Sequence, residues 1–306
     1  MRYFGKTGMK IKRVGFGGIP IQRISQEDTN KVIDELEKCG VNFIDTARGY
    51  TVSEEYLGNA LKGRREKFYI ATKSMSRDYE SMKRDIEISL KNLQTDYIDL
   101  YQMHNVKPAE YDTLFGEDKA YRALLEAKEQ GKIKHIGITS HGLETVEKAV
   151  ESDKFETIQF PYNIVENQAD EVFKRAYEKG VGTIVMKPLA GGAIDDGTLA
   201  MKYLLSREYI DVAIPGMDSP QQVIENTDVL QNYELTEEDN KKIAKIKSEL
   251  GTNFCRRCEY CLPCPKGINI PQNFLLEGYY TRYNLKEWAL ERYNALGESQ
   301  ASKCIE

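Results

Sequence analysis

Residues 68–104 have the sequence FYIATKSMSRDYESMKRDIEISLKNLQTDYIDLYQMH, in which two apolar runs flank an amphipathic segment. The runs, Phe68–Ser74 and Ile98–His104, are short and rich in Ile, Phe and Tyr, which is typical of strands buried in a parallel sheet. Between them, apolar residues recur in steps of three and four, at Tyr79, Met82, Ile86, Leu90 and Leu93. This spacing predicts a helix with one apolar face. The stretch therefore predicts one strand–helix–strand unit.

The same alternation extends through the first two-thirds of the chain. Further apolar runs have the character of buried strands and are separated by helical patterns: Ile11–Gly18, Val41–Ala47, Lys134–Ser140, Glu156–Tyr162, Gly182–Pro188 and Val212–Met217. With the two runs above, they make eight strand–helix units within ~250 residues, which predicts an α/β fold of the closed (β/α)8 TIM barrel type.

A doubly wound open sheet is the alternative fold for this alternation. That fold places a G-x-G-x-x-G turn directly after its first strand, with a helix opening behind it. Here the first run ends in Gly15, Gly17 and Gly18, followed by Ile19 and Pro20. Because this spacing differs from the dinucleotide-binding fingerprint, the sequence favours the barrel.

The composition and charge of the chain exclude several classes of protein. Hydrophobic residues make up 41% of the 306 residues and charged residues 30%, with a net charge of −5, which is typical of a globular protein with a sizeable core. Without a long basic run, we expect no nucleic-acid partner. The charged N-terminus and the absence of an apolar stretch of ~18 residues predict neither a signal peptide nor a membrane span. We therefore expect a cytoplasmic protein with no membrane partner.

Polar residues stand where successive predicted strands end. Asp45 ends the run VNFID, Tyr50 lies in the following loop, Lys73 ends FYIATK, and His104 ends IDLYQMH. Each has an ordinary structural interpretation: an Asp often caps a helix, and a Tyr or His is often a core residue. Because the carboxyl ends of barrel strands form the active site, the four together predict a catalytic site.

The segment FIDTARGYTVSEEYLG, residues 43–58, resembles the signature of the aldo-keto reductase family. The segments IATK, DLYQMH, GKIKHIGITS and IPGMDSPQQVIEN resemble that family's third, fourth, fifth and eighth strands. The resemblance covers nearly all of residues 1–235 in the expected order. It implies a TIM barrel that reduces a small aldehyde or ketone with NAD(P)H, or catalyses the reverse oxidation of an alcohol.

The resemblance also implies roles for the four strand-end residues. Tyr50 is then the general acid that protonates the carbonyl oxygen as hydride arrives. Lys73 would favour the phenolate form and so make that proton easier to give up. Asp45 would hold Lys73 in place, and His104 would orient the substrate oxygen. The nicotinamide supplies the hydride, because no side chain can.

The coenzyme contacts come from the later strands. By resemblance, Thr139 or Ser140, together with Gln159, should bind the carboxamide of the nicotinamide. The glycine pair Gly191 and Gly192 suits either a loop beside the pyrophosphate or a plain turn. The further coenzyme-binding candidates are Met186, Pro188, Leu189, Gly191, Gly216, Gln222, Glu225 and Asn226.

Three of these positions depart from a common family pattern. Met186 and Lys187 precede Pro188, where an aromatic residue often stacks on the nicotinamide. Gly216 and Gln222 occupy positions where many members carry Lys and Arg, which bind the 2′-phosphate of NADPH. The loss of both cations weakens this phosphate site, so we expect a preference for NADH or little discrimination between the two coenzymes.

The composition changes near Gly251, where a charged segment gives way to a cysteine cluster. We therefore predict two domains: the barrel over residues 1–250, and a small Cys-rich, mainly helical extension over residues 251–306. The extension contains C-x2-C-x2-C-x2-C-P at Cys255, Cys258, Cys261 and Cys264. The ferredoxin pattern is C-x2-C-x2-C-x3-C-P, so the last gap is one residue shorter.

This cluster predicts a metal site, and the preferred occupant is a four-iron four-sulfur cluster. Zinc sites usually separate their Cys pairs by ~15–20 residues, whereas only two residues intervene here. Zinc and an empty site are the alternatives, and Cys264 completes this site or serves a second one. The chain resembles the branch of aldo-keto reductases with a ferredoxin-like C-terminal domain, and SKCIE at its end resembles the start of a second motif, cut off after Cys304.

Two other functions are consistent with these residues. A catalytically silent barrel would act as an electron-transfer or redox-sensing protein through its iron–sulfur cluster, together with a redox partner protein. Related barrels also serve as accessory subunits of ion channels, although nothing in this sequence supports that role specifically. The intact set Asp45, Tyr50, Lys73 and His104 favours the reductase.

Overall fold

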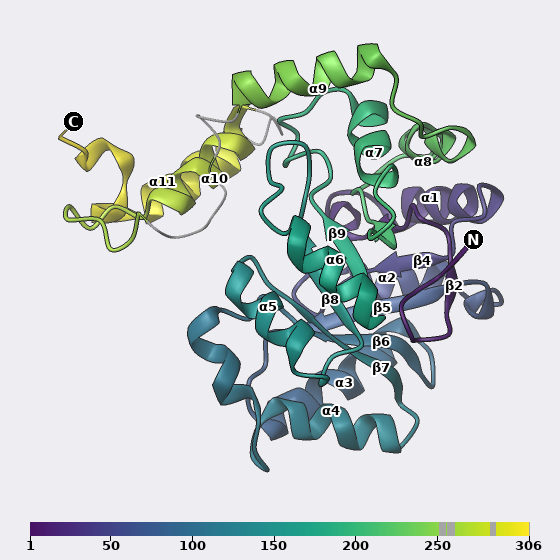
Figure 1. Ribbon diagram of the computed structural model, residues 1–306. Helices are drawn as coiled ribbons and strands as arrows, with labels where there is room; N and C mark the ends of the chain where they lie inside the picture. Colours follow the sequence, from purple (N-terminus) through teal and green to yellow (C-terminus); the bar gives the residue numbers. More distant parts are fainter. Residues whose placement is uncertain (251–254, 256–260, 282–285, 306) are drawn as a thin grey trace.

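The computed structural model describes residues 1–250, 255, 261–281 and 286–305. Its central feature is an eight-stranded parallel sheet in which each strand pairs with its neighbour in the chain. The helices lie around the outside of this sheet (Figure 1). The strands are β3 (Phe16–Gly17), β4 (Phe43–Asp45), β5 (Tyr69–Ser74), β6 (Ile98–Met103), β7 (Ile133–Thr139), β8 (Thr157–Pro161), β9 (Gly182–Met186) and β10 (Val212–Ala213).

The sheet closes on itself where its first and last strands meet. The amide of Gly15 donates to the carbonyl of Ala213 over 2.8 Å, and the amide of Gly17 donates to the carbonyl of Pro215 over 2.9 Å. Parallel bridges join Val14 to Ala213 and Gly17 to Gly216. Closure confirms the predicted barrel and excludes the open doubly wound sheet.

The first predicted run, Ile11–Gly18, is divided between two elements. Ile11 belongs to β2 (Lys10–Ile11), which pairs antiparallel with β1 (Arg2–Tyr3), and only Phe16–Gly17 joins the barrel as β3. The difference arises because the N-terminal hairpin recruits Ile11 as the register partner of Arg2.

The hairpin closes one end of the barrel with apolar side chains. Phe4 is fully buried, and its ring meets that of Phe43 edge to face at 5.5 Å between centroids. A Cβ atom on Gly182 would lie 2.5 Å from the Phe4 ring, so only glycine leaves room for this contact. The inner cluster also contains Met9, Ile11, Ala71, Leu100, Ile184, Val212 and Ile214.

The eight helices that cover the barrel follow the predicted pattern. In α3 the side chains of Met82, Ile86 and Leu93 are buried against the strands, which confirms the apolar face. The other helices are α1 (Gln26–Lys38), α2 (Ser53–Ala60), α4 (Ala120–Glu129), α5 (Leu143–Glu151), α6 (Asp170–Lys179), α7 (Gly197–Leu205) and α8 (Pro220–Asp228), with α3 spanning Tyr79–Leu93.

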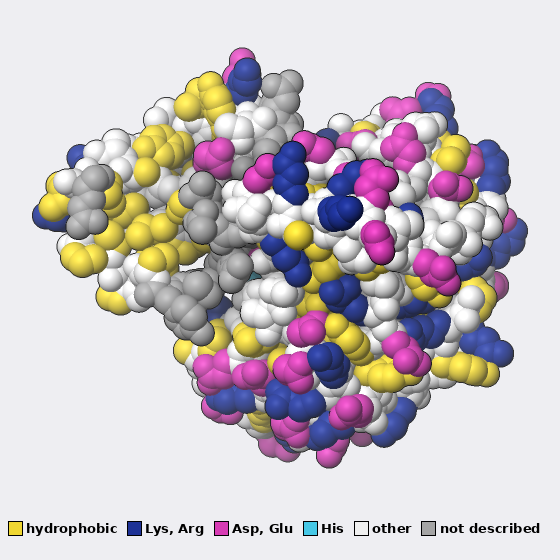
Figure 2. All heavy atoms as spheres, turned by 45° about the horizontal axis from the view of Figure 1, so that its top comes forward, with side chains coloured by type: hydrophobic (Ala, Val, Ile, Leu, Met, Phe, Trp, Pro, Cys, Tyr) yellow, Lys and Arg dark blue, Asp and Glu magenta, His cyan; other side chains and the backbone are white. Residues whose placement is uncertain are grey.

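In the part of the chain that the structure describes, three further α-helices follow the barrel: α9 (Glu237–Leu250), α10 (Ile270–Thr281) and α11 (Lys286–Ala295). The last two lie together at one side of the barrel, on the opposite side of the molecule from the N-terminus (Figure 1). Hydrophobic side chains gather on this C-terminal part of the surface (Figure 2), where Phe274, Trp288 and Leu290 are exposed. The domain boundary after residue 250 stays a prediction, because residues 251–254 lie outside the described residues.

Within the described part of the chain, no helix has both the length and the apolar character that crossing a membrane requires.

Candidate active site

The four predicted catalytic residues converge at the carboxyl end of the barrel strands. Asp45 is the last residue of β4, and Lys73 is the penultimate residue of β5. His104 follows β6 directly, and its amide donates to the carbonyl of Ser74 at the end of β5. Tyr50 lies in the turn between β4 and α2. The strand register therefore brings three of these residues to one end of the barrel, and the turn adds the fourth.

A buried ion pair is the centre of this site. The Nζ of Lys73 lies 2.5 Å from Oδ1 of Asp45 and donates to the carbonyl of Thr46 over 2.7 Å. Lys73 is 1% exposed and Asp45 2% exposed, so water does not screen the pair. The same ammonium lies 5.0 Å from the centroid of the Tyr50 ring.

Burial and charge act in opposite directions on Lys73. Burial by itself would lower the pKa of the ammonium, but the attraction of Asp45 and Tyr50 raises it above its ordinary value. Lys73 is therefore a permanent cation at neutral pH. A buried ammonium of this kind stabilises negative charge that develops on a neighbouring oxygen.

The acidity of Tyr50 differs from the expectation. Burial raises the pKa of its phenol above the ordinary value, and this effect outweighs the opposing effect of Lys73. The carboxylate of Asp45 and the phenol of Tyr279 on α10 raise it further. Lys73 lowers the pKa of Tyr50, as predicted, but burial disfavours the charged phenolate by more than the ammonium favours it. Tyr50 is thus protonated in the resting protein.

The imidazole of His104 packs edge to face against Tyr50, with 6.0 Å between ring centroids. Burial, together with the positive charges of Lys73 and Arg77, lowers the pKa of His104 to about 3. Its buried Nδ1 has no hydrogen-bond partner among the residues that the structure describes. His104 is therefore a neutral imidazole, which has one donor and one acceptor nitrogen.

The predicted carboxamide-binding residues differ in whether their polar side-chain atoms already have hydrogen-bond partners. The Oε1 of Gln159 is buried and, within the described residues, unpartnered, so it fits the amide donor of a nicotinamide. Thr139 Oγ1 accepts from the amide of Asn105 over 2.7 Å. Ser140 Oγ donates to the carbonyl of Val106 and accepts from the amide of Gly142, so its hydroxyl is engaged by its own loop.

The chain after β9 forms a tight coil beside this position. Met186 is the half-buried end of β9, and Lys187, Ala190, Gly191 and Gly192 all have positive φ. Left-handed backbone at two non-glycine residues is strained and is found preferentially at functional sites. Pro188 and Leu189 lie within this coil.

Gly216 has a steric reason to lack a side chain. A Cβ atom there would lie 2.9 Å from Cγ of Pro20, which follows β3 across the closed seam of the barrel. A side chain at position 216 would therefore require Pro20 to shift.

The remaining coenzyme candidates lie on α8 and make hydrogen bonds within this segment of the chain. Gln222 Oε1 accepts from the amide of Asp218 over 2.8 Å, and Asn226 Nδ2 donates to the carbonyl of Gln222. Glu225 accepts from Gln221. The guanidinium of Arg23 lies 3.9 Å from the carboxylate of Asp218. The acidic side chain of Asp218, just before α8, and the cation of Arg23 therefore lie next to one another.

One buried residue of the site escaped the sequence prediction. Gln102 in β6 is fully buried, and its Nε2 donates to Oδ2 of Asp45 over 3.1 Å. Inward and outward side chains alternate along β6, so Gln102 shares the inward face with Leu100, two residues before it, and stands two residues before His104. The alternation of inward and outward residues in IDLYQMH could have identified Gln102, because it stands two residues before His104.

The cysteine cluster lies partly outside the described residues, because Cys258 is not among them. Cys255 and Cys264 are half-buried, and Cys261 is exposed. Over residues 1–250, 255, 261–281 and 286–305, no three His, Cys, Asp or Glu side chains gather closely enough to hold a metal ion. The described geometry therefore supplies no support for the predicted iron–sulfur site.

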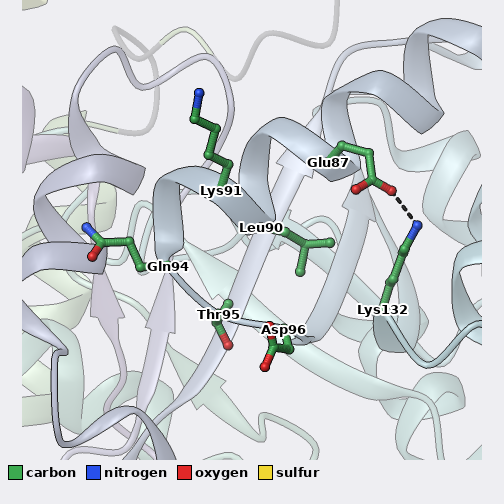
Figure 3. Close-up of a pocket in the computed structure, with 7 residues that line it drawn as sticks. All are labelled: Glu87, Leu90, Lys91, Gln94, Thr95, Asp96 and Lys132. Atoms are coloured by element: carbon green, nitrogen blue, oxygen red, sulfur yellow. Dashed lines mark hydrogen bonds and ion pairs between the residues drawn. The ribbon is translucent and has the colours of Figure 1, made fainter.

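A surface pocket of about 490 Å³ lies at the opposite end of the barrel (Figure 3). Thr95 and Asp96 precede β6 and Lys132 precedes β7, so the pocket borders the amino ends of these strands. An ion pair between Glu87 and Lys132 spans one side of it. Because barrel enzymes act at the carboxyl ends of their strands, this pocket is not the catalytic site.

Comparison with family models matches residues 13–198, which include all four strand-end residues, to the aldo/keto reductase family. An L-galactose dehydrogenase of Arabidopsis thaliana is 26% identical over 301 residues, covering 82% of this chain and 94% of that protein. A methylglyoxal reductase of Escherichia coli K12 is 29% identical, covering 75% and 88%. A solved structure, the holo form of an aldo-keto reductase from Bacillus halodurans, matches with a TM-score of 0.71 at 26% identity, covering 80% and 95%.

The lowered pKa of His104 predicts that its imidazole stays neutral from neutral pH down to about pH 4. An NMR titration of the ring nitrogens should therefore show no protonation of His104 between pH 8 and about pH 5. The His104→Gln variant assigns the signal. A midpoint between about pH 6 and 7 would contradict this description of the site.

Proposed function

The chain belongs to the aldo/keto reductase family and is an NAD(P)-dependent oxidoreductase, and on this premise we propose that it reduces a small aldehyde or ketone, or oxidises the corresponding alcohol, with Tyr50 as general acid. The observation that carries the proposal is the ammonium of Lys73, buried between Asp45 and the ring of Tyr50. The alternative of a catalytically silent electron-transfer barrel has no support in the comparisons.

Proton transfer is the step that these residues perform. When bound, a reduced nicotinamide supplies the hydride that adds to the carbonyl carbon. The carbonyl oxygen then gains negative charge and takes the proton of Tyr50, leaving a phenolate. Because Lys73 stays cationic, it stabilises this phenolate inside the protein, where charges are weakly screened. The raised pKa of Tyr50 keeps the proton in place until that charge develops.

His104 orients the substrate in this proposal. Because its pKa is lowered to about 3, the imidazole is neutral and donates one hydrogen bond without adding a charge. Its edge-to-face packing on Tyr50 places both side chains at one face of the site. A carbonyl oxygen that accepts from both would be held for protonation.

Gln159 is the principal residue for the carboxamide of the coenzyme, since its buried Oε1 is an acceptor without a partner in the described structure. Thr139 and Ser140 lie beside it at the end of β7. Met186 offers a flexible apolar surface at the end of β9 in place of an aromatic ring. The strained coil after it, with Pro188, Leu189 and Gly191, borders the same end of the barrel.

Replacement Tyr50→Phe should lower kcat for carbonyl reduction by ~10²–10⁴-fold, because it removes the general acid. Coenzyme affinity, measured by quenching of protein fluorescence, should change little. The control is Tyr121→Phe, which removes a phenol that donates to the carbonyl of Lys154 on the outside of the barrel. Turnover at the wild-type rate in Tyr50→Phe would overturn the assignment.

We expect this protein to prefer NADH or to discriminate little between NADH and NADPH. Gly216 has no side chain, a Cβ atom there would lie 2.9 Å from Cγ of Pro20, and Gln222 carries no charge. Adding one cation by Gln222→Arg should strengthen NADPH binding by about 10- to 100-fold, since a hydrogen bond to a charged group is worth about 1.5–3 kcal/mol. Dissociation constants for both coenzymes provide the measurement.

Gln221→Arg is the matched control for that substitution, because it adds the same charge to an exposed position of the same helix. It should leave the ratio of the two dissociation constants within about threefold of wild type. An unmodified protein that binds NADPH a hundredfold more tightly than NADH would refute the proposed coenzyme preference.

The cysteine spacing supports a second, separate proposal: Cys255, Cys258 and Cys261 ligate a four-iron four-sulfur cluster, and Cys264 completes that site or serves a second one. Anaerobically purified protein should then contain iron and sulfide and absorb visible light, and Cys258→Ser should lose both signals. Cys39→Ser, in the barrel, is the control. Stoichiometric zinc without iron, or an absence of metal, would exclude the cluster and any redox partner that depends on it.

A further inference from the structure

The carboxylate of Asp45 is held at both of its oxygens. Lys73 binds Oδ1 at 2.5 Å, and Gln102 donates from Nε2 to Oδ2 over 3.1 Å. Asp45 is acceptor-only when ionised, which fixes the amide of Gln102 with its nitrogen toward the carboxylate. The two bonds come from different strands, so together they fix the rotation of the carboxylate as well as its position.

The strand register places Gln102 at the level of the ion pair. Its Cα is the partner of Lys73 on one side and of Gly137 on the other. A Cβ atom on Gly137 would lie 3.0 Å from Cγ of Gln102 and 2.2 Å from Oγ1 of Thr157. Because position 137 has no side chain, the long amide can lie across the barrel interior toward Asp45.

The burial of Gln102 carries a cost that an apolar residue would avoid. Its Oε1 is buried with no hydrogen-bond partner among the described residues. An unsatisfied buried acceptor destabilises a fold, and Met or Leu would fill the same space without it. What Gln102 contributes is an N–H group that donates to the second oxygen of Asp45.

We propose that Gln102 is a positioning residue of the reductase: it keeps the carboxylate of Asp45 oriented, so that Lys73 stays placed to stabilise the Tyr50 phenolate. This inference rests on the proposed function. Gln102 acts through Asp45 and Lys73, so it affects the proton-transfer step and leaves coenzyme binding alone. Its loss therefore lowers kcat with little change in the KM for the carbonyl substrate.

Two substitutions test the proposal. Gln102→Met keeps the shape and removes the donor, so kcat should fall about 10- to 100-fold, as expected for a hydrogen bond to a charged group. Gln102→Glu should be active at low pH, where its protonated carboxyl group donates to Asp45. It should lose activity as the pH rises and the ionised group repels Asp45. The unmodified enzyme should lack this limb of the pH profile.

Thr157→Val is the matched control, because it removes another buried polar atom from the barrel interior, one without a hydrogen bond to Asp45 or any other described residue. It should keep the wild-type kcat. Retention of kcat in Gln102→Met, or a Gln102→Glu profile that follows the wild type, would overturn the proposal. If Tyr50→Phe is inactive while Gln102→Met is fully active, only this inference fails; if Tyr50→Phe is active, the proposed function itself fails.

Discussion

The ion pair between Lys73 and Asp45 is the interaction on which the site depends. Two full charges are removed from water there, and such a pair is tolerated only where the surrounding groups satisfy it. The carbonyl of Thr46 and the amide of Gln102 do so, and the strands that carry them are fixed by closure of the barrel. Removing one member would leave an uncompensated buried charge and would destabilise the barrel interior near the carboxyl ends of the strands.

The ion pair is possible because the side chains inside the barrel change from apolar to polar along the barrel axis. The strands β4, β5 and β6 each carry an apolar inward residue two positions before a polar one, since inward side chains recur with a period of two. The apolar residues join the cluster around Phe4, and the polar ones form the layer above it. The pairs are Phe43 and Asp45, Ala71 and Lys73, and Leu100 and Gln102.

Much of this arrangement could be predicted from sequence. The barrel could be predicted because each strand and each helix has its own local periodicity. The catalytic candidates could be predicted because parallel strands bring their carboxyl ends to the same end of the barrel. Other features depend on contacts between distant segments. The pKa of Tyr50 is raised mainly by burial among segments that are distant in the chain, and a side chain at Gly216 would meet Pro20 across the barrel seam. Neither contact leaves a pattern in the chain.

The N-terminal hairpin has a consequence for how molecules reach the site. Phe4 and the apolar residues around it fill the amino end of the barrel, and Gly182 fits against Phe4 without a gap. The amino end of the barrel is therefore filled with apolar side chains, and the polar atoms of Gln102 and Gln159 that lack partners among the described residues lie beyond it, toward the carboxyl ends of the strands. In our proposal, both the coenzyme and the carbonyl compound reach the site from that end of the barrel.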